Sequence, residues 1–180
     1  MKITTTPIKD LLIIEPRVFA DNRGYFFESF NKNSFTEAGI TDEFVQDNQS
    51  KSSKGTLRGL HFQAPPFAQG KLVRVIQGAV LDIAVDIRKC SPTFGQYFTV
   101  ELTAENQLQF WIPPGFAHGF LTLEDETIFT YKCTNFYNKA SEGGIIWNDP
   151  DVNINWGTTD VLVSEKDMIL PKLSEFTSPF

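Results

Sequence analysis

A short segment in the middle of the chain alternates strictly between apolar and polar residues. From Leu81 to Arg88 every odd position is aliphatic, and the even positions are Asp, Ala, Asp and Arg. A period of two is typical of a half-buried β-strand, because successive side chains of a strand point to opposite faces. The segment from Lys71 to Ile76 precedes it, and Gln77 and Gly78 lie between the two segments. The sequence therefore predicts a β-hairpin with its turn at Gln77-Gly78.

Similar short segments, rich in aromatic and β-branched residues and broken by Gly, Pro and Asn, run along most of the chain. The other strands that we expect cover residues 11–15, 24–30, 44–50, 56–63, 97–102, 107–112, 119–123 and 127–133. One early helix is indicated from Ser34 to Ala38, ended by Gly39, and a helical turn is weakly signalled near the C-terminus. This pattern predicts an all-β sandwich or jelly roll, with residues 1–180 forming a single domain.

Composition excludes several classes of function. The chain of 180 residues has a net charge of −6 and no cluster of Lys or Arg, which argues against a nucleic-acid or anionic-membrane surface. No apolar run approaches the roughly 18 residues of a membrane span, and the N-terminus lacks the apolar core of a signal peptide. Cys90 and Cys133 lack metal-ligand spacing and are interpreted as free thiols. We expect a cytoplasmic protein that binds neither nucleic acid nor membrane.

The chain contains only two histidines, His61 and His118, and each stands close to glycine. Either histidine can be a structural residue of its strand, but glycine permits a bulge and the close approach of a ligand. Strict alternation would put Arg58 and His61 on opposite faces of a strand. A bulge at Gly59 would bring both to one side, and this arrangement is a specific prediction.

A metal site of the cupin type needs two neighbouring histidines, a carboxylate and a further histidine. Gln63 stands two residues after His61, and residues 64–70 contain no Asp or Glu. We therefore expect no bound metal. Without a metal, His61 is free to act as a base, since an imidazole ordinarily titrates near pH 6.5.

Two further residues can carry chemistry if they point into the barrel. Tyr131 shares a strand face with Phe129 and Cys133, so it is either a core tyrosine or a proton donor. Lys71 shares a face with Val73 and Val75, so it is either a solvated rim residue or a cation that holds a developing oxyanion.

The segment from Arg23 to Glu28 combines a cation, aromatic residues including Phe26, and a carboxylate. It is either a plain strand after a turn or a site with an Arg for phosphate, an aromatic face for a base and an acceptor for an imide N–H. The chain has no Gly-rich phosphate loop and no dinucleotide fingerprint. Any nucleotide is therefore expected to be held by side chains.

Together these residues resemble the dTDP-4-dehydrorhamnose 3,5-epimerase family. The order and spacing of the motifs match along nearly the whole chain, and any one motif alone would be weak. The matching segments are Phe19–Glu28, Gln46–Asn48, Arg58–Gln63, Lys71, Pro113–Phe120, Tyr131, Tyr137, Glu142–Trp147 and Glu165–Asp167.

The resemblance implies a homodimeric jelly-roll (cupin-like) double-sheet β-barrel with a few short helices. It also implies an isomerase without cofactor, which epimerises C3 and C5 of dTDP-4-dehydro-6-deoxy-D-glucose to give dTDP-4-dehydro-L-rhamnose for carbohydrate biosynthesis, as in lipopolysaccharide O-antigen. His61 would be the base, Asp167 its carboxylate partner and Tyr131 the acid, with Lys71 and His118 near the keto and enolate oxygens. The other substrate-binding residues would be Arg23, Phe26, Glu28, Gln46, Asn48, Arg58, Tyr137 (stacking on thymine), Glu142 and Lys166.

Other functions stay open at this stage. A related enzyme that inverts a single centre, or a ketoisomerase, would need much the same residues. A sugar-binding jelly roll without activity and a metal-dependent cupin oxygenase belong to different classes. The sequence also leaves open the choice between dTDP and UDP, the dimer surface and the orientation of Asp82.

Overall fold

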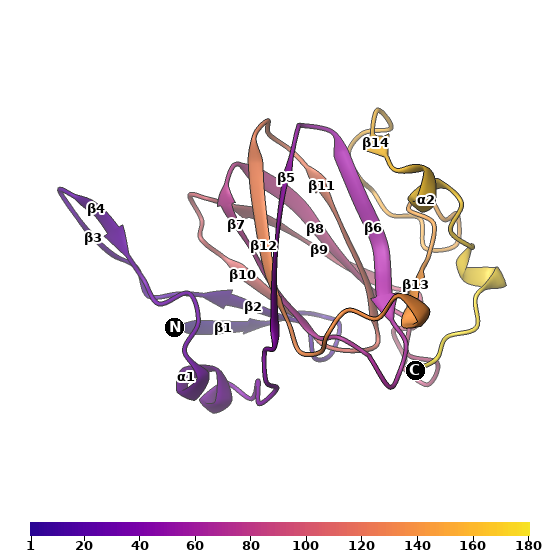
Figure 1. The fold of residues 1–180 in the computed structure, drawn as a ribbon, viewed down its shortest axis with the longest axis horizontal. Helices are drawn as coiled ribbons and strands as arrows, with labels where there is room; N and C mark the ends of the chain where they lie inside the picture. The colour runs from indigo at the N-terminus through magenta and orange to yellow at the C-terminus, as the bar shows by residue number, and fades with distance from the viewer.

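Two β-sheets face each other and enclose most of the core in this computed structural model, which describes residues 1–180 (Figure 1). The strand order of the first sheet is β1 (Lys2–Thr5), β2 (Leu12–Glu15), β10 (Gln109–Ile112), β7 (Lys71–Gln77), β12 (Thr127–Cys133) and β5 (Gln46–Ser52). The order of the second sheet is β13 (Glu142–Gly144), β6 (Thr56–Gln63), β11 (Phe116–Thr122), β8 (Ala79–Asp86) and β9 (Tyr97–Thr103). The predicted jelly-roll double-sheet barrel is confirmed.

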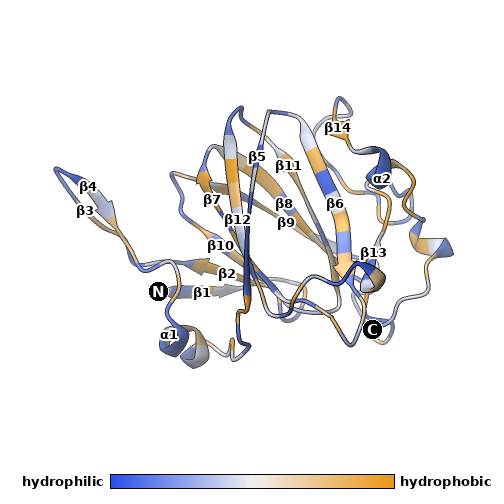
Figure 2. Ribbon diagram, in the orientation of Figure 1, coloured by the Kyte–Doolittle hydropathy of each residue, from blue (hydrophilic) through white to orange (hydrophobic).

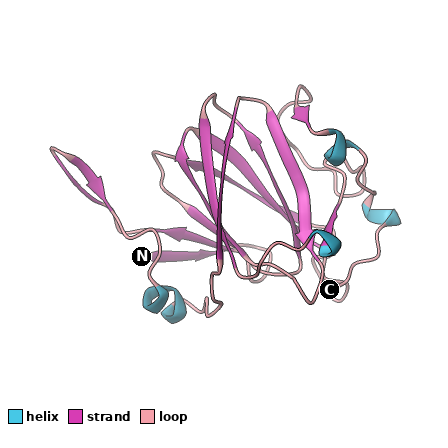
Figure 3. Cartoon of the chain, in the orientation of Figure 1, coloured by secondary structure: helices cyan, strands magenta, loops and turns pink.

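The remaining elements are short and lie at the margins of the barrel (Figure 3). Strand β14 (Leu162–Val163) pairs in parallel with β6, whereas β3 (Phe19–Asp21) and β4 (Gly24–Phe26) form a separate hairpin. The helices are α1 (Lys32–Glu37) and α2 (Glu165–Met168), with 3₁₀ turns η1 (Lys139–Ser141) and η2 (Leu173–Glu175). None of the helices is long and apolar enough to span a membrane.

The predicted hairpin between β7 and β8 is wrong, because the two strands belong to opposite sheets. β7 pairs with β10 and β12, whereas β8 pairs with β9 and β11. Gly78, with φ of 77°, turns the chain from one sheet to the other. Val75 and Val80 are buried in one cluster between the sheets, so the apolar faces of the two strands meet across the core. A Gly turn between two apolar segments does not distinguish a hairpin from this corner.

Strand β8 is also more buried than the alternating pattern predicts. Its aliphatic odd positions, Ile83 and Val85, pack outside the barrel against a second cluster that includes Trp156 from the C-terminal part of the chain. Its even positions, Val80 and Ala84, face the barrel interior. Both faces are therefore covered, and the polar even positions Asp82 and Asp86 are completely buried rather than solvated. Figure 2 shows a similar alternation along β6.

The early segments differ from prediction in extent. The strand expected over residues 24–30 is only β4, in a hairpin that projects away from the barrel (Figure 1). The residues of the hairpin are exposed, so no buried contacts stabilise a longer pairing of β3 with β4. The predicted helix is present, but it begins at Lys32 because Asn31 caps it by accepting backbone hydrogen bonds from Asn33 and Ser34.

Candidate active site

A cavity of about 530 Å³ lies between the two sheets. Seven of the residues predicted for the site line this one cavity, namely Arg58, His61, Lys71, His118, Tyr131, Lys166 and Asp167. His61 and Arg58 come from β6 and His118 from β11 of the second sheet, whereas Lys71 and Tyr131 come from β7 and β12 of the first. The two sheets thus present different chemical groups to a shared space.

The predicted bulge at Gly59 is confirmed, and it explains why two β6 residues share the cavity. His61 pairs with His118 and Arg58 with Phe120, so one residue of β11 lies opposite two residues of β6. Gly59 has φ of 119°, and a Cβ there would lie 2.5 Å from the Cα of Gly119. Glycine is required at this position by both backbone conformation and space.

His61 is paired with Asp167 at the edge of the cavity. The Nε2 atom of His61 lies 2.6 Å from Oδ1 of Asp167, and the backbone N–H of Gly59 donates to Oδ2 at 3.3 Å. The two side chains are 30% and 5% exposed, respectively. Burial opposes ionisation of Asp167, but the hydrogen bonds and charge of His61 prevail and lower its pKa. The pair therefore combines an ionised carboxylate with an imidazole that solvent can reach.

Asp167 is positioned by the start of α2. Ser164 is the N-cap residue, and its Oγ accepts a hydrogen bond from the backbone N–H of Asp167 at 3.1 Å. Ser164 also lines the cavity. Ser164 was not among the residues predicted from the sequence, although a Ser three residues before Asp167 is itself a cap signal.

His118 is paired with a second carboxylate, deeper in the barrel. Its Nε2 atom lies 3.0 Å from both carboxylate oxygens of Asp82. The side chains of His118 and Asp82 are 7% and 0% exposed. Burial raises the pKa of Asp82 and lowers that of His118, while the charge of each opposes the shift of the other. The open question of where Asp82 points is thereby answered, since it faces the interior.

Lys71 and Tyr131 provide the polar groups of the opposite sheet. Lys71 shares its face with Val73 and Val75 as predicted, and burial lowers its pKa against the charges of Cys133, Asp82 and Glu142. Tyr131 packs against the interior cluster that contains Phe129. Burial raises the pKa of Tyr131, so the phenol is protonated at neutral pH.

A polar cluster borders the cavity next to Lys166. Nζ of Lys166 donates to Oε1 of Glu142 at 2.6 Å, and the hydroxyl of Tyr137 donates to Oε2 of Glu142 at 3.0 Å. The side-chain oxygen of Gln46 accepts from the backbone N–H of Tyr137, and its amide donates to Asn48. Tyr137 is 57% exposed, so its ring is accessible for stacking.

Three predicted residues lie elsewhere in the chain's structure. Arg23, Phe26 and Glu28 belong to the projecting β3–β4 hairpin and the chain just after it, and none of them lines the cavity. The side chain of Arg23 is 86% exposed and pairs with Asp21, while Phe26 is 67% exposed. Within one chain they are not brought to the other site residues.

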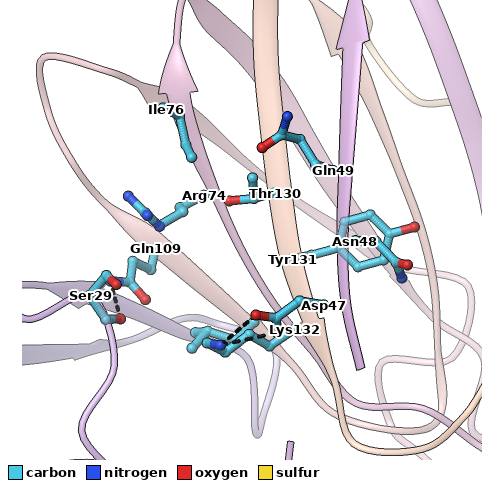
Figure 4. Close-up of a pocket in the computed structure, with 11 residues that line it drawn as sticks. Ser29, Asp47, Asn48, Gln49, Arg74, Ile76, Gln109, Thr130, Tyr131 and Lys132 are labelled. Atoms are coloured by element: carbon cyan, nitrogen blue, oxygen red, sulfur yellow. Dashed lines mark hydrogen bonds and ion pairs between the residues drawn. The ribbon is translucent and has the colours of Figure 1, made fainter. Parts of the chain in front are cut away.

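A second cavity, of about 320 Å³, lies on the other face of the first sheet. Figure 4 shows Arg74, Thr130 and the ion pair of Lys132 with Asp47 facing it, whereas the ring of Tyr131 points away from Arg74. It contains no histidine. This outer cavity therefore lacks the imidazole–carboxylate pair that the barrel cavity has.

The barrel cavity defines a class of protein. A jelly-roll barrel that presents an imidazole–carboxylate pair, a protonated phenol and an ammonium to one cavity can move protons on a polar small molecule. The residues contain no group of three or more His, Cys, Asp or Glu that could hold a metal ion.

Comparison with known proteins makes the class specific. The family model described as dTDP-4-dehydrorhamnose 3,5-epimerase matches residues 5–175. The dTDP-4-dehydrorhamnose 3,5-epimerase of Shigella flexneri is 58% identical over 169 residues, which cover 93% of each chain. The chain belongs to the dTDP-4-dehydrorhamnose 3,5-epimerase family. The family resemblance and the isomerase class expected from the sequence are thus confirmed.

Two solved structures extend the comparison. The dTDP-6-deoxy-D-glucose-3,5-epimerase of Legionella pneumophila, crystallised with dTDP-4-keto-L-rhamnose, is 51% identical with a TM-score of 0.93, covering 96% of this chain and 93% of that one. A 3′-monoepimerase from Streptomyces bikiniensis, crystallised with dTDP-quinovose, is 33% identical with a TM-score of 0.89, covering 94% of this chain and 87% of that one. The barrel therefore occurs in enzymes that differ in the number of centres they invert.

Proposed function

We propose that this protein epimerises C3 and C5 of dTDP-4-dehydro-6-deoxy-D-glucose to give dTDP-4-dehydro-L-rhamnose, without metal or organic cofactor. The observation that carries the proposal is the convergence of His61, Tyr131 and Lys71 on one cavity. The family membership supports the same activity.

The chemistry requires an enolate that the protein stabilises. A C–H group beside a ketone loses its proton only if the resulting charge on the ketone oxygen is held. C3 and C5 both flank C4, so a single cation at O4 serves both centres. Lys71 is the partly buried cation of the cavity and fits this role.

Inversion also requires proton transfer on two faces of the sugar. His61 stands on β6 of one sheet and Tyr131 on β12 of the other, so a sugar bound between the sheets would have a base on one face and an acid on the opposite face. Asp167 keeps the His61 proton on Nε2 and leaves Nδ1 free to accept the substrate proton. Tyr131, protonated at neutral pH, returns a proton.

The nucleotide would lie along the mouth of the cavity. Arg58 and Lys166 supply positive charge for the diphosphate, and the exposed ring of Tyr137 supplies a stacking surface for thymine. Gln46 and Glu142, which both accept hydrogen bonds from Tyr137, and Asn48, which accepts one from Gln46, would complete the base and sugar contacts.

We further propose a homodimer in which the β3–β4 hairpin completes the site of the partner. The support is that Arg23, Phe26 and Glu28 lie on a projecting, exposed hairpin away from the cavity of their own chain. Two inactive variants, Arg23→Ala and His61→Ala, test this by mixing. Mixed dimers would contain one site with both native residues, so activity should return; if each hairpin serves its own chain, none returns.

The activity is tested by incubating the substrate in D₂O with native and chelator-treated protein. Deuterium at both C3 and C5 and an L-manno product by NMR are expected in each case. Tyr131→Phe should impair reprotonation more than deprotonation. Hydrogen exchange on the face of the sugar next to His61 should therefore continue in this variant when product formation is slowed. Undiminished product formation by Tyr131→Phe would remove its role as the acid.

The likeness to a 3′-monoepimerase makes a single-centre epimerase the second candidate. The same NMR experiment separates the two, because deuterium at C3 alone and a product without the L-manno configuration identify a single inversion. A parallel titration with the UDP-linked sugar would measure the preference for the base.

We also propose that residues 1–180 act as one cytoplasmic domain. The clusters on both sides of the second sheet include residues from the N-terminal and C-terminal parts of the chain, which supports joint folding. A single cooperative unfolding transition is expected by calorimetry.

A further inference from the structure

We propose that Asp82 is a positioning residue that holds the His118 proton on Nε2, so that Nδ1 presents a hydrogen-bond acceptor to a hydroxyl group of the bound sugar. The identity of the ligand rests on the proposed function. The state of the imidazole does not, because it follows from the residues of this chain alone.

The geometry fixes which ring atom of His118 is paired within the chain. Both oxygens of Asp82 lie 3.0 Å from Nε2 of His118, and no other side chain or backbone group donates to this carboxylate. Asp82 is completely buried, and His118 lines the cavity. Nδ1 of His118 makes no hydrogen bond within the chain and is therefore left for a ligand.

Burial, with the charges of Lys71 and His61, favours the neutral ring of His118 against the opposing charge of Asp82. Asp82 from β8, Lys71 from β7 and His61 from β6 all act on it, and the ring of Phe129 from β12 stacks at 6.3 Å. A buried carboxylate is tolerated when one cation compensates it. Lys71 supplies that cation, and its charge acts on Asp82 directly. If His118 also carried a positive charge, the set of Asp82, Lys71 and His118 would have a net positive charge.

A neutral imidazole with its proton on Nε2 has a lone pair on Nδ1. Such a nitrogen accepts a hydrogen bond, so it matches a sugar hydroxyl and does not match an enolate oxygen. Lys71 and His118 would then divide the work: the ammonium binds the keto oxygen and the imidazole binds a hydroxyl beside it. Asp82 would act on the substrate only through His118.

The chain allows a direct test because it has only two histidines. Nitrogen-15 labelling of histidine gives two ring systems by NMR, and His61→Asn assigns them. We expect His118 of the native protein to be neutral with an unprotonated Nδ1 at neutral pH. A protonated Nδ1, or a charged ring, would overturn the proposal whether or not the protein is an epimerase.

The Asp82→Asn variant provides the kinetic arm. Its amide can donate to Nε2, so we expect a protonated Nδ1 in the spectrum and a KM raised about tenfold, with kcat changed less than about threefold. Asp86→Asn is the matched control, since Asp86 is a completely buried residue of the same strand that lies outside the cavity. It should leave KM and the His118 spectrum unchanged.

The outcomes separate the two proposals. An unchanged KM in Asp82→Asn together with a changed tautomer would show that His118 binds no hydroxyl. An equal rise of KM in Asp86→Asn would reduce Asp82 to a merely structural residue. If the native protein shows no epimerisation but the expected tautomer, the proposed function fails while the assignment of the His118 proton holds.

Discussion

The cavity contains two His–Asp pairs that are alike in bonding and different in burial. In both pairs Nε2 faces the carboxylate, which leaves Nδ1 for the cavity. The side chain of His61 is 30% exposed, against 7% for His118. Ionising an imidazole is penalised by burial, so His61 is the ring suited to take up a whole proton, and His118 is suited to accept a hydrogen bond. The comparison teaches that exposure, not the partner residue, divides their roles.

The strongest way to break the comparison is to remove His61. His61→Ala should lower kcat by about 10⁴ and abolish deuterium uptake at both C3 and C5, because the base for both centres is lost. The measurement is hydrogen exchange followed by NMR at saturating substrate.

His118→Asn is the matched variant for this test. It should keep exchange at both carbons when the substrate concentration is raised, since the base is intact. Exchange at the native rate in His61→Ala, or its complete loss in His118→Asn, would contradict the division of roles.

The Asp167→Asn variant tests whether the carboxylates of Asp167 and Asp82 also differ in their roles. Asp167 stabilises the charged imidazole that forms during proton transfer, so the variant should lose about 10²–10³ in kcat with a small change in KM. Steady-state kinetics beside Asp82→Asn is the measurement. The same pattern of kcat and KM in both variants would mean that the pairs are equivalent.

Ser164→Ala should have a smaller effect on the same pair. The N-cap hydroxyl holds the first turn of α2, and losing it weakens the helix start by about 1 kcal/mol, which corresponds to at most about fivefold in kcat. Ser164→Thr keeps a hydroxyl and is expected to retain most of the activity. A kcat that is identical in Ser164→Ala and the native protein would show that α2 is held by other contacts.

Part of this site was predictable from the sequence. Alternation alone indicated that Tyr131 shares a face with Phe129 and Cys133, and that Lys71 shares one with Val73 and Val75; those faces are the interior. The bulge at Gly59 followed from the need to bring Arg58 and His61 together. These are local properties of single strands, which follow from a period of two and from a glycine that allows a departure from it.

The arrangement of strands was not predictable in the same way. The turn at Gly78 carries a hairpin signal, but the pairing of β7 and β8 depends on partners far away in the sequence. Asp82 occupies a position of the alternating pattern that is expected to face solvent. A polar site in the interior and solvent both favour polar side chains, so the pattern does not distinguish them. The separation of Arg23 from the cavity depends on where the hairpin points, which its own sequence does not specify.

The smallest effect on activity is expected for Asp86→Asn, the control variant for Asp82→Asn. The role of Asp86 in stability can be tested separately. Burial alone would raise the pKa of Asp86, but hydrogen bonds from Arg88, Ser91 and Thr93 lower it to about 2, from 3.8. A depressed pKa in the folded state stabilises the fold above the unfolded pKa, and this contribution is lost as the pH falls from about 4 through about 2. Asp86→Asn should therefore reduce the free energy of unfolding by about 2 kcal/mol at neutral pH, since its hydrogen bonds are to a charged group.

The difference in unfolding free energy between native protein and Asp86→Asn should shrink as the pH is lowered toward 2, as measured by urea unfolding at a series of pH values. Activity at neutral pH should be unchanged wherever the variant is folded, because Asp86 faces neither the cavity nor His118. A difference that stays constant with pH would mean that the Asp86 charge does not stabilise the fold. It would also show that burial alone does not distinguish a carboxylate with a structural role from one that acts on a histidine. The hydrogen-bond partner of each carboxylate would then be needed to assign its role.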